Sequence, residues 1–335
     1  MQNNPILVTG IHRSGSTFVG NMLSLNRNIG YIQEPFNRDY GLKIFDVNFT
    51  YLTDTSITHQ IQKTLDQLIL LDKADYHIPS INREHHGLEN RKELCRDFFA
   101  QPNIQNTPAF IKRLLFKSKG QLLFNRAKYD PRVDRLLIKD PLACLASSFL
   151  HQRYDMDVVI LVRHPLSFAG SLKRLGWRFN FDNILSQEQL MSDYLKPYRE
   201  ELIYLQNKQT TVVEEAAMLW NCIYTVLTNF ISKNPSFIVC RHEDIAQSPV
   251  KTFHNLYSKL NLNYTASVEK KISEHTNEDN PVSTQNNRAH QLKRNSEALI
   301  YKWKDILTED EIIHISEKTK KIASNFYQQD FFRDI

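Results

Sequence analysis

The chain opens with a short apolar run, followed by a glycine-bounded loop and then by apolar positions at helical spacing. The run covers residues 5–9, the loop covers residues 10–15, and the amphipathic stretch extends from residue 16 to about residue 26. A short continuous apolar run fits a buried strand, whereas apolar positions three and four residues apart fit a helix. The pattern therefore predicts a strand, a loop and a helix, in that order.

The same alternation returns three times further along the chain. Each time an apolar run precedes a stretch of helical periodicity, and the pairs are residues 136–139 and 142–152, residues 157–163 and 165–175, and residues 236–241 and 249–260. Strands rich in Val and Ile that alternate with helices are typical of a parallel sheet covered on both faces. We therefore expect an α/β fold class, with three layers and a central parallel sheet flanked by helices.

Two long segments between these units have a different character. Residues 36–134 and residues 179–234 contain many polar residues and show helical periodicity, which is clearest over residues 57–71. Such periodicity is typical of amphipathic helices. We expect one domain over residues 1–335, with these two segments as helical inserts.

The last part of the chain combines a polar stretch with a final helix. Residues 277–295 are poor in apolar side chains, which predicts a loop. Residues 309–326 are amphipathic, and Thr308 stands where a helix cap is expected.

Composition indicates a globular protein. Of the 335 residues, 41% are apolar and 24% are charged, which suits one large α/β domain or a core domain with an insertion. The longest apolar runs, such as residues 158–162, are far shorter than the roughly 20 residues of a membrane-spanning helix. The first residues also lack the layout of a signal peptide. We therefore expect a cytoplasmic protein without a transmembrane segment.

Charge and spacing argue against several kinds of partner. The net charge of +5 favours anionic ligands, yet no block of Lys and Arg interleaved with aromatic residues indicates nucleic acid. His85 and His86 are adjacent and have no spaced Cys or His nearby, so no metal site is expected. The cysteines are too scattered for a disulfide framework and are expected to be free thiols; they are Cys95, Cys144, Cys222 and Cys240.

The loop after the first predicted strand has the character of a phosphate cradle. It reads Gly10-Ile-His-Arg-Ser-Gly15-Ser-Thr17, and its main-chain N–H groups and the following helix N-terminus would face one point. A nucleoside-triphosphate P-loop requires a lysine where this chain has Ser16, which disfavours a kinase. Arg13 supplies a cation within the loop instead. The alternative is a plain Gly/Ser turn with an exposed arginine.

This loop resembles the 5'-phosphosulfate-binding loop of the sulfotransferase superfamily. The resemblance implies a P-loop-like α/β fold and 3'-phosphoadenosine-5'-phosphosulfate (PAPS) as the donor, with adenosine 3',5'-bisphosphate (PAP) as the product and no metal required. It also implies which loop residues bind the donor: His12, Arg13, Ser14, Gly15, Ser16 and Thr17.

A second motif resembles the 3'-phosphate-binding strand and helix of the same superfamily. Arg163 ends an apolar strand, and Ser171 follows eight positions later. An arginine at a strand end and a hydroxyl two turns into the next helix can bind one phosphate from two sides. The alternative is an Arg and a Ser on an ordinary surface turn.

Two further motifs resemble the tyrosine and carbohydrate branches of the superfamily. Lys139, followed by Asp-Pro, resembles a lysine that contacts the leaving group, and Glu34 stands 21 positions after Arg13, at the spacing of a catalytic glutamate. The resemblance implies Glu34 as catalytic base, with Lys139 and Arg13 stabilising the leaving group. Alternatively, Lys139 is a surface lysine beside a helix cap at Asp140, and Glu34 binds a backbone amide.

Near the C-terminus, Lys302 directly precedes Trp303 in a segment that resembles the one closing over the donor in this superfamily. The resemblance places Lys302 on the 3'-phosphate side. A solvated basic face is the alternative. Residues 241–245 resemble a segment that follows a core strand in many members, where its role is mainly structural.

These motifs together predict a sulfotransferase of bacterial, cytoplasmic type that acts on an acceptor hydroxyl. The two inserts are expected to shape the acceptor site, and a carbohydrate or glycolipid is the first candidate acceptor. A peptidyl tyrosine or a small metabolite comes next. A P-loop kinase and a nucleotide-binding module without catalysis are the competing hypotheses.

Overall fold

The computed structural model of the chain describes residues 4–39, 41–42, 44–70, 127–208, 210–276 and 300–327. The middle of the first predicted insert and the predicted loop over residues 277–295 lie outside these ranges. So do Cys95, His85 and His86.

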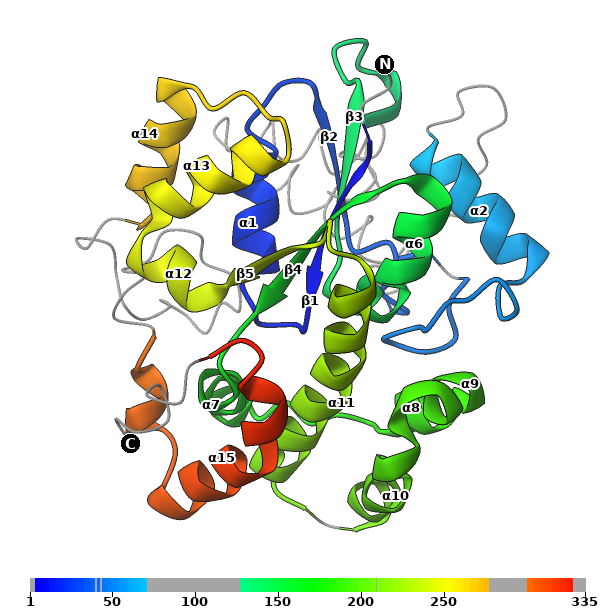
Figure 1. Cartoon of the computed structure of the whole chain (residues 1–335), viewed down its shortest axis with the longest axis vertical. Coiled ribbons are helices and arrows are strands. Elements are labelled where there is room, and N and C mark those ends of the chain that lie inside the picture. The colour runs from blue at the N-terminus through cyan, green and yellow to red at the C-terminus, as the bar shows by residue number, and fades with distance from the viewer. Residues whose placement is uncertain are drawn as a thin grey trace, which may run out of the picture.

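Five parallel strands form the central sheet (Figure 1), in the order β2-β3-β1-β4-β5. β1 is central, and its Val8 stands opposite Lys139 of β3 and Val159 of β4. The predicted parallel α/β sheet is therefore confirmed. The strands are β1 (Ile6–Gly10), β2 (Ile29–Gln33), β3 (Arg135–Lys139), β4 (Asp157–Val162) and β5 (Ile238–Arg241).

One face of the sheet is covered by helices from both ends of the chain. Apolar side chains of these helices pack on Val8, Leu137 and Val159, which all point to this face. Figure 1 shows these helices together on one side of the strands. They are α1 (Ser16–Leu23), α12 (His242–Gln247), α13 (Pro249–Lys259) and α14 (Ala266–Thr276).

The opposite face carries the larger of the two hydrophobic clusters. Leu7, Ile138 and Ile160 point to this face, as expected from the alternation of side chains along a strand. The elements that contribute to this cluster include α2 (His59–Ile69), the 3₁₀ helix η2 (Pro141–Ala146), α6 (Ser147–Tyr154), α7 (Pro165–Leu175), α11 (Val212–Lys233) and α15 (Glu309–Ala323).

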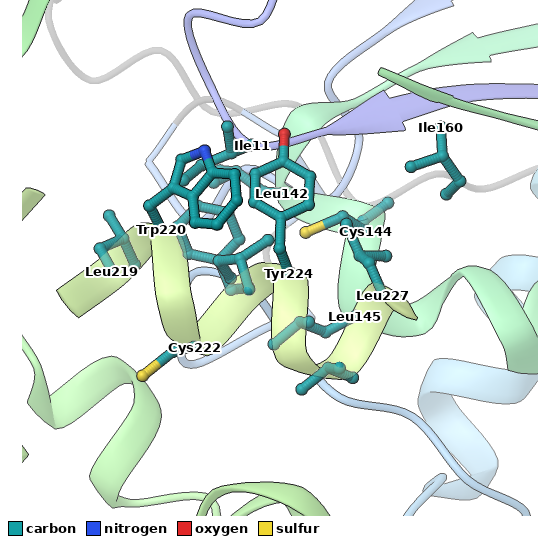
Figure 2. Close-up of a cluster of buried hydrophobic side chains, with 14 of the residues drawn as sticks. Ile11, Leu142, Cys144, Leu145, Ile160, Leu219, Trp220, Cys222, Tyr224 and Leu227 are labelled. Atoms are coloured by element: carbon teal, nitrogen blue, oxygen red, sulfur yellow. The ribbon is translucent and has the colours of Figure 1, made fainter. Parts of the chain in front are cut away.

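The long helix α11 packs against the carboxyl end of β4. Its Trp220 and Tyr224 are fully buried and lie near Ile11 and Cys144 (Figure 2). The Trp220 Nε1–H donates to the carbonyl of Arg163 over 2.9 Å, and the Tyr224 hydroxyl donates to the carbonyl of Leu161 over 2.9 Å. The end of the second predicted insert is thus part of the core.

The rest of that segment is a series of short helices. They are α8 (Asp182–Leu185), α9 (Glu188–Leu190), the π-helix η3 (Met191–Leu195), the 3₁₀ helix η4 (Lys196–Tyr198) and α10 (Arg199–Asn207). The structure does not test whether the two predicted inserts shape an acceptor site, so that role stays a prediction.

Most predicted elements are present with shifted ends. The first helix ends at Leu23 rather than near residue 26, and the last ends at Ala323 rather than at residue 326. The helix predicted over residues 142–152 begins as the 3₁₀ helix η2, because Asp140 caps the Leu142 N–H and Pro141 occupies the first helical position. Thr308 caps α15 as predicted.

Within the described ranges, no helix is both long and apolar enough to cross a bilayer. The three cysteines found there, Cys144, Cys222 and Cys240, are buried free thiols.

Candidate active site

The predicted site residues lie where the parallel strands end. In a parallel α/β sheet, the carboxyl ends of the strands meet at one edge, and ligands bind there. The loop after Gly10 leaves β1, Glu34 follows β2, Lys139 ends β3, Arg163 follows β4 and His242 follows β5. The sheet thus gathers five segments that are far apart in the sequence.

The loop after β1 has a backbone that requires glycine at its start. Gly10 has a φ of 130°, and a Cβ atom there would lie 2.2 Å from the carbonyl oxygen of Leu161. Arg13, at φ 66°, and Gly15, at φ 94°, also adopt left-handed conformations. Gly15 then precedes the first turn of α1, which contains no acidic residue.

The same loop has features of an anion site. The Ser14 hydroxyl is fully buried and has no hydrogen-bond partner among the described residues. Buried polar groups are normally hydrogen-bonded, so an unpaired hydroxyl beside a helix N-terminus fits a ligand with acceptor oxygens. A phosphate or sulfate group meets that requirement.

Glu34 and Lys139 form an ion pair at this edge. The Lys139 Nζ contacts the Glu34 Oε1 and donates to the Thr17 hydroxyl over 3.2 Å. The Lys139 side chain is 0% exposed and that of Glu34 is 25% exposed. The suggestion of a surface lysine is therefore wrong, because Lys139 points inward beneath α1, whereas Asp140 does cap the next helix.

Gly20 provides room for the Lys139 side chain. A Cβ atom at residue 20 would lie 2.9 Å from the Lys139 Cγ and 3.0 Å from the Tyr31 ring. The lysine stem passes through the space that this glycine leaves open. Nothing in the sequence pattern indicated this role, since it depends on a contact across 119 positions.

Gly20→Ala is expected to displace Lys139 and to lower kcat by about tenfold to a hundredfold, as misplaced catalytic groups do. Overpacking should cost about 1–3 kcal/mol of stability, partly offset by the roughly 1 kcal/mol that alanine gains over glycine in a helix. Turnover and Tm are measured together.

Gly176→Ala is the control, because residue 176 has a φ of 64° but no atom within 4 Å of the added Cβ. It should lower Tm and leave kcat unchanged; normal turnover in a folded Gly20→Ala would contradict the role.

Arg13, Arg163 and Ser171 lie together on the other side of the loop. The Arg13 Nε–H donates to the Ser171 hydroxyl over 3.3 Å, and the Arg163 Nη1–H donates to the Arg13 carbonyl over 2.7 Å. The Arg13 guanidinium also lies 5.5 Å from the ring of Trp177. The two predicted ends of the donor site are thus directly connected. Their separate roles stay predictions.

His12 is held in an aromatic environment. Its ring centroid lies 5.3 Å from that of Phe168, 5.9 Å from that of Phe49 and 6.5 Å from that of Trp177. Burial, and next the charge of Arg13, lower the pKa of His12 to about 4. His12 is therefore uncharged at neutral pH, and a contact with the donor, which stays a prediction, would be made by a neutral ring.

Lys302 begins the 3₁₀ helix η7 (Lys302–Asp305), which lies against α7. The Ser167 hydroxyl donates to the carbonyl of Ile300 over 3.0 Å, and a Cβ atom at Gly170 would lie 3.1 Å from the Trp303 Cβ. Lys302 is thus on a segment packed on the helix that carries Ser171. Its contact with the donor stays a prediction.

A buried carboxylate supports the turn after Arg163. The Glu243 Oε1 accepts the main-chain N–H of His164 over 3.1 Å, and its Oε2 accepts the Tyr327 hydroxyl over 2.9 Å. Burial raises the pKa of Glu243. The sequence suggested a mainly structural segment here, and these contacts show that the segment fixes the residue next to Arg163.

Metal ligands are not gathered in the part of the chain that the structure describes. No three His, Cys, Asp or Glu side chains lie close enough there to hold an ion. Independence from metal stays a prediction.

Fold and site together define an α/β protein with a P-loop-like, glycine-bounded loop at the carboxyl edge of a parallel sheet. The chain belongs to the Sulfotransferase family, because the model of that family matches residues 5–266, most of its length. It is therefore a sulfotransferase. Lys302 lies beyond the matched residues.

Similar solved structures include three sulfotransferases. The sulfotransferase domain from the curacin biosynthetic pathway is 16% identical, with a TM-score of 0.47, and the match covers 97% of this chain and 98% of that one. Sulfotransferase STF9 from Mycobacterium avium is 15% identical, with a TM-score of 0.45, and the match covers 97% of this chain and 77% of that one. Mouse sulfotransferase SULT7A1 complexed with PAP is 10% identical, with a TM-score of 0.44, and the match covers 98% of this chain and 87% of that one. No curated protein matches the chain.

Proposed function

We propose that this sulfotransferase transfers the sulfuryl group of PAPS to an acceptor hydroxyl, with Glu34 as the catalytic base. The observation that carries the proposal is the contact of Glu34 with Lys139, and of Lys139 with Thr17, beside the anion-binding loop. A carboxylate and an ammonium group thus lie next to each other near the start of α1.

The donor would be held at two points. The loop N–H groups, with Ser14, Ser16 and Thr17, would bind the 5'-phosphosulfate, and Arg13 would add positive charge. Arg163 and Ser171 would bind the 3'-phosphate, with Lys302 near them. The unpaired Ser14 hydroxyl supports the first point, and the position of Arg163 beside Arg13 supports the second.

Glu34 would accept the proton of the acceptor hydroxyl as its oxygen forms a bond to sulfur. The bond between sulfur and the bridging oxygen of the 5'-phosphate breaks at the same time, and its electron pair stays on that oxygen. Lys139 and the loop N–H groups would stabilise the charge that develops there, because donors aimed at developing charge lower the barrier. Sulfuryl transfer needs this in-line positioning more than covalent help.

The acceptor is proposed to be a carbohydrate or a glycolipid hydroxyl. The proposal rests on Glu34-Pro35, which resembles the corresponding segment of carbohydrate sulfotransferases. A peptidyl tyrosine or a small metabolite is the alternative. Transfer of labelled sulfate from PAPS to matched panels of glycans, tyrosine peptides and phenols tests which class of acceptor is preferred. Faster transfer to the tyrosine peptides or the phenols than to the glycans would overturn the proposed acceptor class.

A cytoplasmic location also remains a prediction.

Arg163→Gln is expected to weaken PAP binding by about tenfold to a hundredfold, because hydrogen bonds to charged groups contribute about 1.5–3 kcal/mol. Calorimetry without magnesium measures the affinity. Arg241→Gln is the matched control, since Arg241 stands opposite Val162 at the same sheet edge and pairs with Asp244. Equal losses in both variants would mean that total charge, not a specific contact, holds the donor.

Magnesium dependence separates this function from a kinase. Binding of PAP by the wild type without magnesium supports sulfuryl transfer. Magnesium-dependent ATP binding without PAP binding would contradict it.

A further inference from the structure

The turn that carries Glu34 has an unfavourable backbone. Glu34 has a φ of 52°, a left-handed conformation that costs a residue with a side chain about 1–2 kcal/mol. Its main-chain N–H donates to the carbonyl of Lys139 over 2.8 Å, which fixes the residue at one end. Other contacts must hold the chain beyond it in the same turn.

Asp140 supplies the next contact. Its side chain is fully buried; the Oδ2 accepts the main-chain N–H of Phe36 over 2.6 Å, and the Oδ1 accepts that of Leu142 over 2.9 Å. One carboxylate thus joins the turn after β2 to the start of η2. No other described side chain accepts the Phe36 N–H in this structure.

The main chain of Asp140 is itself fixed to the central strand. Its N–H donates to the carbonyl of Val8 over 3.0 Å, and its carbonyl accepts the Thr9 hydroxyl over 2.6 Å. Asp140 therefore transmits the position of β1 to the segment that carries Glu34. It acts beside the direct hydrogen bond from the Glu34 N–H to the Lys139 carbonyl.

We infer that Asp140 is a positioning residue for the base: its ionised carboxylate holds the Glu34 turn in the conformation that keeps the Glu34 carboxylate at Lys139. This inference rests on the proposed function of Glu34. Asp140 does not contact the reacting atoms. It acts through the main chain of residues 34–36.

The charge state of Asp140 matters because two N–H groups point at its two oxygens. A protonated carboxyl carries hydrogen on one oxygen and accepts both N–H groups less well. Titratable groups around it are Glu34, Lys139, Tyr31 and Cys144. Burial, and next the charge of Glu34, raise the pKa of Asp140 from 3.8 to about 7, against the opposing effects of the two N–H groups and Lys139.

Activity and stability should therefore respond to pH in opposite directions. As the pH rises through about 7, Asp140 loses its proton, the turn is held more firmly and kcat rises. The raised pKa means that the folded state binds the extra proton between about pH 4 and about pH 7, so the contribution of Asp140 to stability falls over that range as the pH rises. If Asp140 had only a structural role, its contribution to stability would still fall as the pH rises, but kcat would not rise with it.

Asp140→Asn is the variant that tests the inference. An amide has a single acceptor oxygen and presents its NH₂ to one of the two N–H groups. We expect kcat to fall by about tenfold, as for a slightly misplaced catalytic group, while the affinity for PAP stays within about twofold. The acid side of the kcat profile should lose the step near pH 7.

Glu243→Gln is the matched control, because Glu243 is an equally buried carboxylate that accepts a main-chain N–H. It lies next to Arg163 rather than Glu34, so its loss should fall on PAP affinity and leave the pH profile of kcat unchanged. The same change of profile in both variants would overturn the inference.

A double variant separates this inference from the proposed function. If Asp140 acts through Glu34, Asp140→Asn should add little further loss to Glu34→Gln, since coupled residues are not additive. A full additional loss in that background would overturn the inference while leaving Glu34 as base. Normal turnover of Glu34→Gln alone would instead overturn the proposed function. Should Asp140→Asn not fold, the wild-type profile still decides: a kcat that is flat through pH 7 contradicts the inference.

Discussion

Glu34→Gln is expected to lower kcat by about 10²- to 10⁴-fold, the range that general base catalysis contributes. The amide keeps the size of the side chain but cannot take the proton of the acceptor hydroxyl. PAP affinity should change little, because Glu34 is proposed to act on the acceptor hydroxyl and not to contact the donor. Steady-state turnover with saturating PAPS, together with calorimetric PAP binding, measures both quantities.

The chain offers a close control for this variant. Glu311 is also 25% exposed, and it is also ion-paired with a lysine, Lys173 on α7, over 2.7 Å. Glu311→Gln therefore removes a carboxylate of the same exposure and pairing outside the site. Its kcat should match the wild type. Near-normal turnover of Glu34→Gln, or an equal loss in both variants, would rule out Glu34 as the base.

Lys139→Met is expected to lower kcat by about 10²- to 10³-fold, as removal of one donor to a developing negative charge does in other enzymes. Methionine fills the space beneath α1 but brings no charge. PAP binding should also weaken, because the lysine is proposed to contact the 5'-phosphate. This second effect distinguishes Lys139→Met from Glu34→Gln.

Lys173→Met serves as the comparison for that result. Lys173 pairs with Glu311 and donates to the carbonyl of Ile306 over 2.9 Å, so its loss also breaks an ion pair and a main-chain contact. Lys173→Met should lower Tm and leave kcat and PAP affinity unchanged. A Lys139→Met enzyme that binds PAP normally and turns over normally would show that Lys139 only supports the fold.

The sheet could be predicted from the sequence where strands are continuous apolar runs. β1, β3, β4 and β5 are such runs, and each precedes a helical pattern. β2 was not delimited, because its sequence Ile-Gly-Tyr-Ile-Gln is interrupted by Gly30 and ends in a polar residue. A residue with a side chain would not fit at position 30, because a Cβ atom there would lie 2.8 Å from the side chains of Ala127 and Val133. The local sequence pattern does not reveal this contact.

The candidate site was predictable as far as its chemistry is local. A glycine-bounded loop, an arginine at a strand end and a glutamate before proline can each be recognised in a few residues. The partners of these residues could not be recognised, because they come from distant segments. Asp140 reaches Phe36 across 104 positions, and Glu243 reaches Tyr327 across 84. The Arg13 to Ser171 hydrogen bond, over 158 positions, is of the same kind.

The neighbouring positions of β2 and β3 in the sheet have a consequence for how the segment between them can change. Gln33 stands opposite Lys139, so strand pairing brings the chain before the proposed base beside the cation, although about a hundred residues separate them in sequence. Lengthening a connection costs little, since doubling a loop adds only about 0.6 kcal/mol of closure entropy. Parts of the intervening segment that do not pack on the core can therefore be lengthened during evolution, or in a chimera, without moving the two proposed catalytic groups apart.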